Sequence, residues 1–134
     1  SACAKTNNAY NLEDINVNQV FIKLNNSSFD AFVKELNPDI VLFDRFMTEE
    51  QFGWRITENC PNALRLLDTE DLHCLRKGRQ QAHKDQKAFD DSYLFNETAN
   101  REIASIYRCD LTLMISEVEI DILIKKFKID KALF

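Results

Sequence analysis

Glycine and proline are scarce in this chain of 134 residues, which holds only two of each. It contains no Asn-Gly or Asp-Gly pair, although these pairs are the strongest short-range signals of a tight β-hairpin. Antiparallel hairpins are therefore disfavoured. We expect the strands to be joined by longer crossover connections instead.

Several motifs that would reveal a cofactor or a nucleophile are also missing. The chain has no GxGxxG, no GxxxxGKS/T and no GxSxG, so a dinucleotide fingerprint, a P-loop and a nucleophile elbow are not indicated. Its cysteines are far apart and form no CxxC pair, which argues against zinc binding and a disulfide framework. We expect no metal site, and reduced, mostly buried thiols at Cys3, Cys60, Cys74 and Cys109.

The charge and the apolar runs exclude further classes. A formal net charge of −5 argues against general affinity for nucleic acid, which needs a surplus of Lys and Arg. No apolar run reaches the roughly 18 residues that a membrane-spanning helix needs, and residues 1–10 do not resemble a signal peptide. We therefore expect a soluble, cytoplasmic protein whose residues 1–134 form a single domain.

Short apolar runs alternate with helical patterns along the chain, in the order typical of βαβ units. The runs are rich in Val, Ile, Leu and Phe without strict alternation, as in strands buried on both faces of a parallel sheet. They predict strands at Gln19–Leu24, Asp39–Asp44, Ala63–Asp68, Leu111–Ser116 and Lys131–Phe134.

The helical patterns have recognisable starts and ends. An apolar stripe with i, i+3, i+4, i+7 spacing predicts a helix over 29–36, and Pro38 closes it. Capping-box spacing predicts two more helix starts, at Thr48 with Gln51 and at Ser116 with Glu119.

Together these patterns predict a Rossmann-like, three-layer α/β/α domain with a mostly parallel sheet. The first residues resemble the close of an earlier strand, and the last apolar run stops at Phe134 within a strand pattern. We expect the domain to be truncated at both ends.

Ligands of open parallel sheets bind beyond the carboxyl ends of the strands, so the polar segments that follow the strands are the candidate site. Their carboxylates and imidazole suit general-base chemistry on a hydroxyl or binding of a divalent cation. The candidates are Asp44, Arg45, Asp68, Glu70, Asp71, His73, Ser116 and Glu117.

Structural roles compete with these chemical roles. Asp68 and Thr69 have the residue types that cap a following helix, and acidic residues just after them favour its positive end. Asp44 and Arg45 suit either an ion pair at a strand end or a guanidinium that holds an anionic group of a ligand.

A basic stripe contrasts with the acidic whole. Its members are spaced three or four residues apart, so they share one face of a helix. This face suits binding to anionic lipid headgroups or to a phosphorylated acceptor. The alternative is a charged face that is only solvated. The stripe consists of Arg76, Arg79, His83 and Lys87.

Two stretches carry a resemblance to a known family. The segment from Pro38 to Gln81 reads PDIVLFDRFMTEEQFGWRITENCPNALRLLDTEDLHCLRKGRQQ, and a second, Tyr107 to Leu123, reads YRCDLTLMISEVEIDIL. Both resemble bacterial glycosyltransferases of the glycogen-synthase-like, retaining GT-B type (group 1 or family 4-like), specifically their amino-terminal, acceptor-side domain.

The resemblance implies half of a two-domain enzyme that transfers a hexose from a nucleotide sugar to a glycan or lipid-linked acceptor. The nucleotide sugar would be held by a carboxyl-terminal donor-binding domain, whose paired-glutamate motif has no counterpart here, so no cofactor and no independent activity are expected of this domain. The composition places such an enzyme in the cytoplasm, and the basic stripe suits peripheral contact at the inner face of the membrane. The competing interpretation is a stand-alone flavodoxin-like or Rossmann-like binding module.

Overall fold

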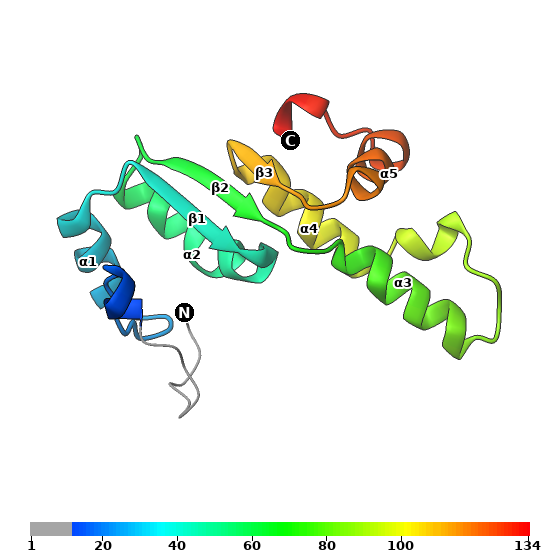
Figure 1. Ribbon diagram of the computed structural model, residues 1–134, viewed down its shortest axis with the longest axis horizontal. Coiled ribbons are helices and arrows are strands. Elements are labelled where there is room, and N and C mark those ends of the chain that lie inside the picture. The colour runs from blue at the N-terminus through cyan, green and yellow to red at the C-terminus, as the bar shows by residue number, and fades with distance from the viewer. Residues whose placement is uncertain (1–11) are drawn as a thin grey trace.

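The computed structural model describes residues 12–134, so Cys3 and the expected end of an earlier strand lie outside the described residues. Within these described residues, five α-helices, three strands and three short 3-10 helices follow one another (Figure 1). Their bounds are η1 Leu12–Ile15, α1 Ser28–Leu36, β1 Ile40–Asp44, α2 Arg45–Asn59, β2 Leu64–Asp68, α3 His73–Lys84, η2 Asp91–Leu94, α4 Glu97–Arg108, β3 Leu111–Leu113, α5 Glu117–Phe127 and η3 Lys131–Leu133.

The strands form one sheet in the order β1-β2-β3, and both neighbouring pairs are parallel. Residues pair from Ile40 with Leu64 to Asp44 with Asp68, and β3 continues the row with Leu113 beside Asp68. The expected α/β class with a parallel sheet is confirmed, as are the three central strands, although the last is shorter than expected.

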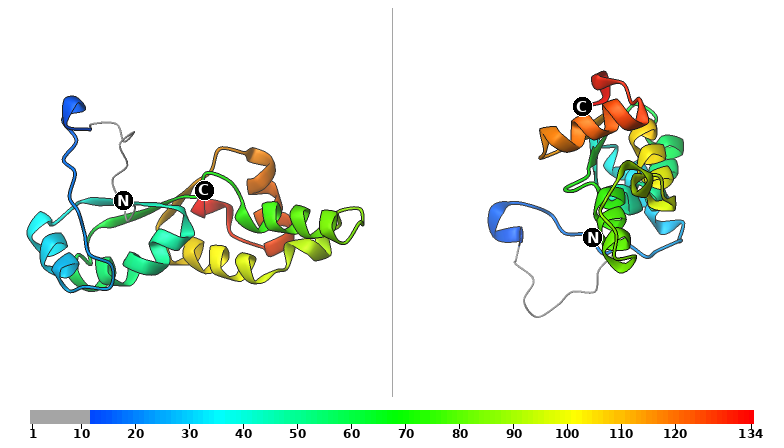
Figure 2. Two further views of the ribbon diagram at one scale, coloured as in Figure 1. Left: turned by 90° about the horizontal axis from the view of Figure 1, so that it is seen from below. Right: turned by 90° about the vertical axis from the view of Figure 1, so that its right-hand side faces the viewer.

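Helices α2 and α4 pack on one side of the sheet, as the two views of Figure 2 show. Phe43 and Leu67 point to this side and are buried at the centre of the core, with Val41 partly buried beside them. On the other side Ile40, Leu42 and Leu64 stay exposed, and Leu42 keeps 54% of its accessible surface. One face of the described sheet is therefore apolar and largely uncovered.

Two expected strands are wrong. No backbone hydrogen bond joins residues 19–24 to the sheet, and most of the apolar side chains of this segment are exposed, with Ile22 partly buried against the core. The segment Lys131–Phe134 instead contains a 3-10 helix, because the Asp130 carboxylate accepts a hydrogen bond from the Ala132 amide and so begins a tight turn.

The start of α2 also differs from the expectation. The chain passes from β1 directly into the helix at Arg45, and Thr48 lies one turn inside it. Arg45 makes this abrupt change of direction with a left-handed backbone, at a φ of 64°. The expected helix start at Ser116 is confirmed, since its hydroxyl accepts a hydrogen bond from the Glu119 amide at 3.4 Å, while the Glu119 carboxylate accepts one from the Leu72 amide.

A buried carboxylate ties α2 to α4 behind the sheet. Glu49 is 2% exposed and accepts hydrogen bonds from the Ser105 hydroxyl at 2.7 Å and from the Arg108 guanidinium at 2.5 to 3.0 Å. Because its charge is paired with a guanidinium and bonded to a hydroxyl, burial of this carboxylate is tolerated.

The described cysteines are free and buried as expected, and burial raises the pKa of the Cys109 thiol to about 12.

Gly78 provides the first test of the packing. A β-carbon at this position would lie 2.6 Å from the Tyr93 carbonyl oxygen, a backbone atom that cannot rotate away. We expect Gly78→Ala to lower the free energy of unfolding by about 1 to 2 kcal/mol, because this clash outweighs the better helix propensity of alanine. Chemical denaturation measures the change. The exposed Gln80→Ala control on the same helix should change it by less than about 0.5 kcal/mol, and an equally stable Gly78→Ala protein would contradict this packing.

Candidate functional site

The candidate site lies at the edge of the sheet where β1 and β2 end. The parallel register sets Asp44 directly beside Asp68, so the residues that follow the two strands emerge together. We call this edge the rim and define it as Asp44, Arg45, Asp68, Glu70 and Asp71. The sequence-based expectation that the segments after β1 and β2 share one edge is confirmed.

Arg45 is held between two carboxylates of the rim. Its Nε and Nη2 donate hydrogen bonds to the two oxygens of Asp44 at 3.0 and 2.9 Å, and its Nε lies 3.9 Å from Glu70. The hydrogen-bonded guanidinium lowers the pKa of the Asp44 carboxyl below its ordinary value. The ion pair expected between these two residues therefore forms. Both side chains also keep substantial exposure, so the geometry is compatible with the alternative in which Arg45 holds an anionic group of a ligand.

The backbone of the rim is constrained on both sides. Glu70 has a left-handed backbone with a φ of 55°, and it faces Arg45, which has the same conformation. Such conformations cost residues with a β-carbon about 1 to 3 kcal/mol and tend to cluster at functional sites. The surrounding contacts must therefore hold this loop in place.

Those contacts come from Thr69 and Asp68. The Thr69 amide and hydroxyl both donate to the Leu113 carbonyl oxygen, at 3.2 and 3.1 Å, and the Asp68 carboxylate accepts from the Glu70 amide at 3.3 Å. The alternative that these two residues cap the next helix is wrong. They instead anchor the loop to β3 and close its first turn.

Two glutamates from other helices cap α3 in their place. Glu102 of α4 accepts hydrogen bonds from the His73 and Cys74 amides, both at 2.7 Å, and Glu119 of α5 accepts one from the Leu72 amide at 3.3 Å. Carboxylates suit this position because the amino-terminal end of a helix is partly positive. Burial raises the pKa of the Glu102 carboxyl, while the two amide bonds act in the opposite direction.

Sequence reasoning missed Glu102, although a signal was present. Glu102 is three residues after Ala99 and four before Ile106, so it lies on the same face of α4 as these apolar residues. A carboxylate on a buried face needs a partner, which here is the end of α3.

His73 lies beneath the rim rather than on it. It is 4% exposed, its ring packs edge-on against Phe46, and its two nitrogens lie 3.4 Å from Asp71 and 3.6 Å from Glu102. Burial lowers the pKa of His73 below its ordinary value of 6.5, against the opposing charge of Asp71. The imidazole therefore lies between Asp71 and the start of α3, while the carboxylates of the rim are the groups exposed to solvent.

The third polar segment approaches the rim through α5. Ser116 is occupied as the cap of this helix, and Glu117 is exposed in its first turn. The hydrogen bond from Leu72 to Glu119 brings the start of α5 against the loop after β2. The side chain of α5 that contacts the loop is thus that of Glu119, which follows the predicted segment and was not among the expected site residues.

Three of the four residues of the expected basic stripe lie on α3. Arg76, Arg79 and His83 are exposed on α3, and Arg76 pairs with Asp71 at 3.1 Å. Lys87 lies beyond Lys84, where α3 ends, so its expected place on the same helical face is wrong.

A cleft of about 400 Å³ opens next to the rim, at the outer edge of β1 between α1 and α2. Its inner wall is apolar, with Phe29, Val41 and Phe52 among the lining residues. Polar groups line it as well, namely Asp44, Arg45, Thr48 and Gln51. The rim and the cleft therefore share Asp44 and Arg45.

No group of three acidic, histidine or cysteine side chains within residues 12–134 is arranged to hold a metal ion. In the same part of the chain, no helix has the length and apolar character to cross a membrane. This chain matches no protein-family model, no curated protein and no solved structure.

The pKa of His73 predicts a pH dependence of stability. Because burial lowers the pKa of His73 in the folded protein, the unfolded chain takes up a proton at a higher pH than the folded protein does. The contribution of His73 to stability is therefore present above pH 6.5 and lost below it. We expect His73→Gln to flatten the fall in unfolding free energy between about pH 7.5 and 5.5, measured by denaturant titration. The other histidine gives the control, since His83→Gln at an exposed position should keep the wild-type slope, and equal slopes in all three proteins would refute this reasoning.

Proposed function

We propose that this chain is the acceptor-side domain of a GT-B-type glycosyltransferase and that it binds a sugar acceptor where the rim meets the cleft. One observation carries the proposal. Exposed carboxylates and a fixed guanidinium stand at the carboxyl edge of a parallel sheet, directly beside a partly apolar cleft. Ligands of open α/β sheets bind at this edge.

The chemistry of the rim and of the cleft suits a glycan or a lipid-linked sugar. Carboxylates such as Asp44 and Glu70 accept hydrogen bonds from hydroxyl groups, and the Arg45 guanidinium is fixed beside them. The apolar wall of the cleft suits the non-polar face of a sugar ring or the first carbons of a lipid carrier. The acceptor hydroxyl would then lie at the rim, where the donor must approach.

The uncovered sheet face supports the larger architecture. In a three-layer α/β/α domain a second set of helices covers the face on which Ile40, Leu42 and Leu64 are exposed. We propose that this chain forms part of such a Rossmann-like domain, and that a donor-binding domain, carrying the nucleotide sugar, faces the rim.

The proposed division of labour limits what this chain does alone. Transfer from a nucleotide sugar requires stabilisation of the leaving diphosphate, which the proposal assigns to the donor-binding domain. The rim is dominated by carboxylates and repels a diphosphate. The chain by itself should thus bind acceptors but not donors.

Binding by nuclear magnetic resonance tests the proposal. Titration with an alkyl glycoside below its micellar concentration should shift the amide signals of Arg45, Thr48 and Gln51, and nucleotide sugars should not. Asp44→Asn should weaken this binding about tenfold, because it removes a charged hydrogen-bond acceptor. The control Asp121→Asn, which removes an equal charge from the exposed surface of α5, should leave it unchanged. Shifts confined to other surfaces, or preferential binding of a nucleotide sugar, would reject the proposal.

A further inference from the structure

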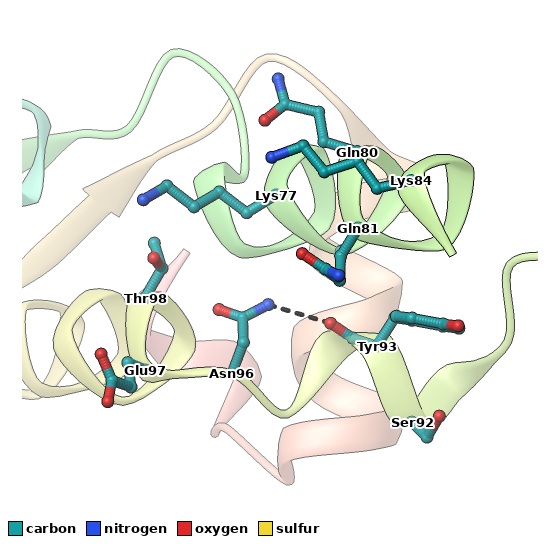
Figure 3. A pocket seen from close by; sticks show the side chains of 10 residues that line it. Lys77, Gln80, Gln81, Lys84, Ser92, Tyr93, Asn96, Glu97 and Thr98 are labelled. Atoms are coloured by element: carbon teal, nitrogen blue, oxygen red, sulfur yellow. Dashed lines mark hydrogen bonds between the residues drawn. The ribbon is translucent and has the colours of Figure 1, made fainter. Parts of the chain in front are cut away.

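A second cavity, of about 530 Å³, lies between α3 and the turn that joins η2 to α4 (Figure 3). It shares no residue with the rim or the cleft beside it. One wall is the face of α3 that carries Lys77, Gln81 and Lys84, and the other is formed by η2 and the first turn of α4. This cavity has no part in the function proposed above.

Two cations stand over this cavity without an acidic partner. Lys77 and Lys84 are two turns apart on α3, and neither forms an ion pair with any residue within 12–134. Figure 3 shows both side chains along the same wall of the cavity. Nearby acids are engaged elsewhere, because Asp85 accepts from Gln81 and from the Tyr93 hydroxyl, and Asp91 pairs with Lys126. The exposed Glu97 is the one acidic residue among those that line the cavity.

The opposite wall is the amino-terminal end of a helix of 12 residues. Asn96 fixes this end, since its side chain accepts from the Ala99 amide at 3.1 Å and donates to the Cys74 and Tyr93 carbonyl oxygens at 3.1 and 2.9 Å. The amides of Glu97 and Thr98 have no acceptor in the described part of the chain. They are the positive end of the α4 dipole and can donate to an anion.

The Thr98 side chain is the second, independent sign of a ligand. Thr98 is 8% exposed and lines the cavity, yet its hydroxyl forms no hydrogen bond with any described residue. The hydroxyl keeps access to water, because Thr112 Oγ1 is the one side-chain oxygen or nitrogen in the described residues that is buried without a partner. A ligand that enters the cavity can therefore use this hydroxyl as a hydrogen-bond donor or acceptor.

We propose that this cavity binds the phosphate group of a small phosphate monoester. The phosphate oxygens would accept hydrogen bonds from the Thr98 hydroxyl and from the amides of Glu97 and Thr98, and the two lysines would balance the negative charge. The cavity is larger than a phosphate ion, and polar Gln81, Ser92 and Tyr93 line the remaining space. These groups suit a polar organic portion with hydroxyls, such as a sugar or glycerol.

Titration of the intact chain with inorganic phosphate and with glycerol phosphate, at constant ionic strength, tests this proposal. Amide signals of Glu97 and Thr98 should shift and saturate with both ligands. The double variant Lys77→Gln/Lys84→Gln should weaken the binding at least tenfold. Its matched control is Arg79→Gln/Lys87→Gln, which removes the same charge from exposed positions that do not line the cavity and should change the affinity less than twofold.

Thr98→Val separates a binding role from a structural role. It should weaken phosphate binding about fivefold while the protein melts at the same temperature or higher, because the hydroxyl has no partner to lose. Thr98→Ser keeps the hydroxyl and should keep the affinity. The proposal is overturned if both double variants weaken binding equally, which would mean a diffuse attraction to positive charge. It is also overturned if the shifts do not saturate or do not include Glu97 and Thr98.

Discussion

The parallel pairing of β1 with β2 is the constraint on which the rest of the site depends. Because the register is exact from Ile40 with Leu64 to Asp44 with Asp68, two segments that are 24 residues apart end at the same edge. Each strand then turns away abruptly, and the turns place Arg45 and Glu70 in left-handed conformations that face each other. The charged rim is thus a direct product of strand direction and register.

Buried carboxylates keep the helices in the positions that this edge requires. Glu102 fixes the start of α3 by accepting two of its amides, and Glu49 links α2 to α4 through Arg108. Hydrogen bonds to buried charges are stronger than neutral ones, but a buried charge that loses its partner is costly. The helices behind the rim are therefore held by a few specific contacts as well as by apolar packing.

The sequence predicted the central strands and the shared edge because these depend on local patterns: continuous apolar runs, few glycines and polar residues at the strand ends. It failed where tertiary contacts decide. Gln19–Leu24 has the composition of a strand but no partner in the described sheet, and Thr48 has the spacing of a cap although the chain is already helical at Arg45. Glu102 was missed because its role as a cap joins two helices that are distant in sequence.

The direction and register of β1 against β2 are the central claim, and nuclear Overhauser contacts between their backbone protons measure both directly. The structure predicts contacts that advance together along the two strands, with Leu42 near Leu66 and Asp44 near Asp68. Contacts that run in opposite directions, with Asp44 near Leu64 and Ile40 near Asp68, would show that the strands are antiparallel. Asp44 and Asp68 would then lie at opposite edges of the sheet, and the rim would not exist.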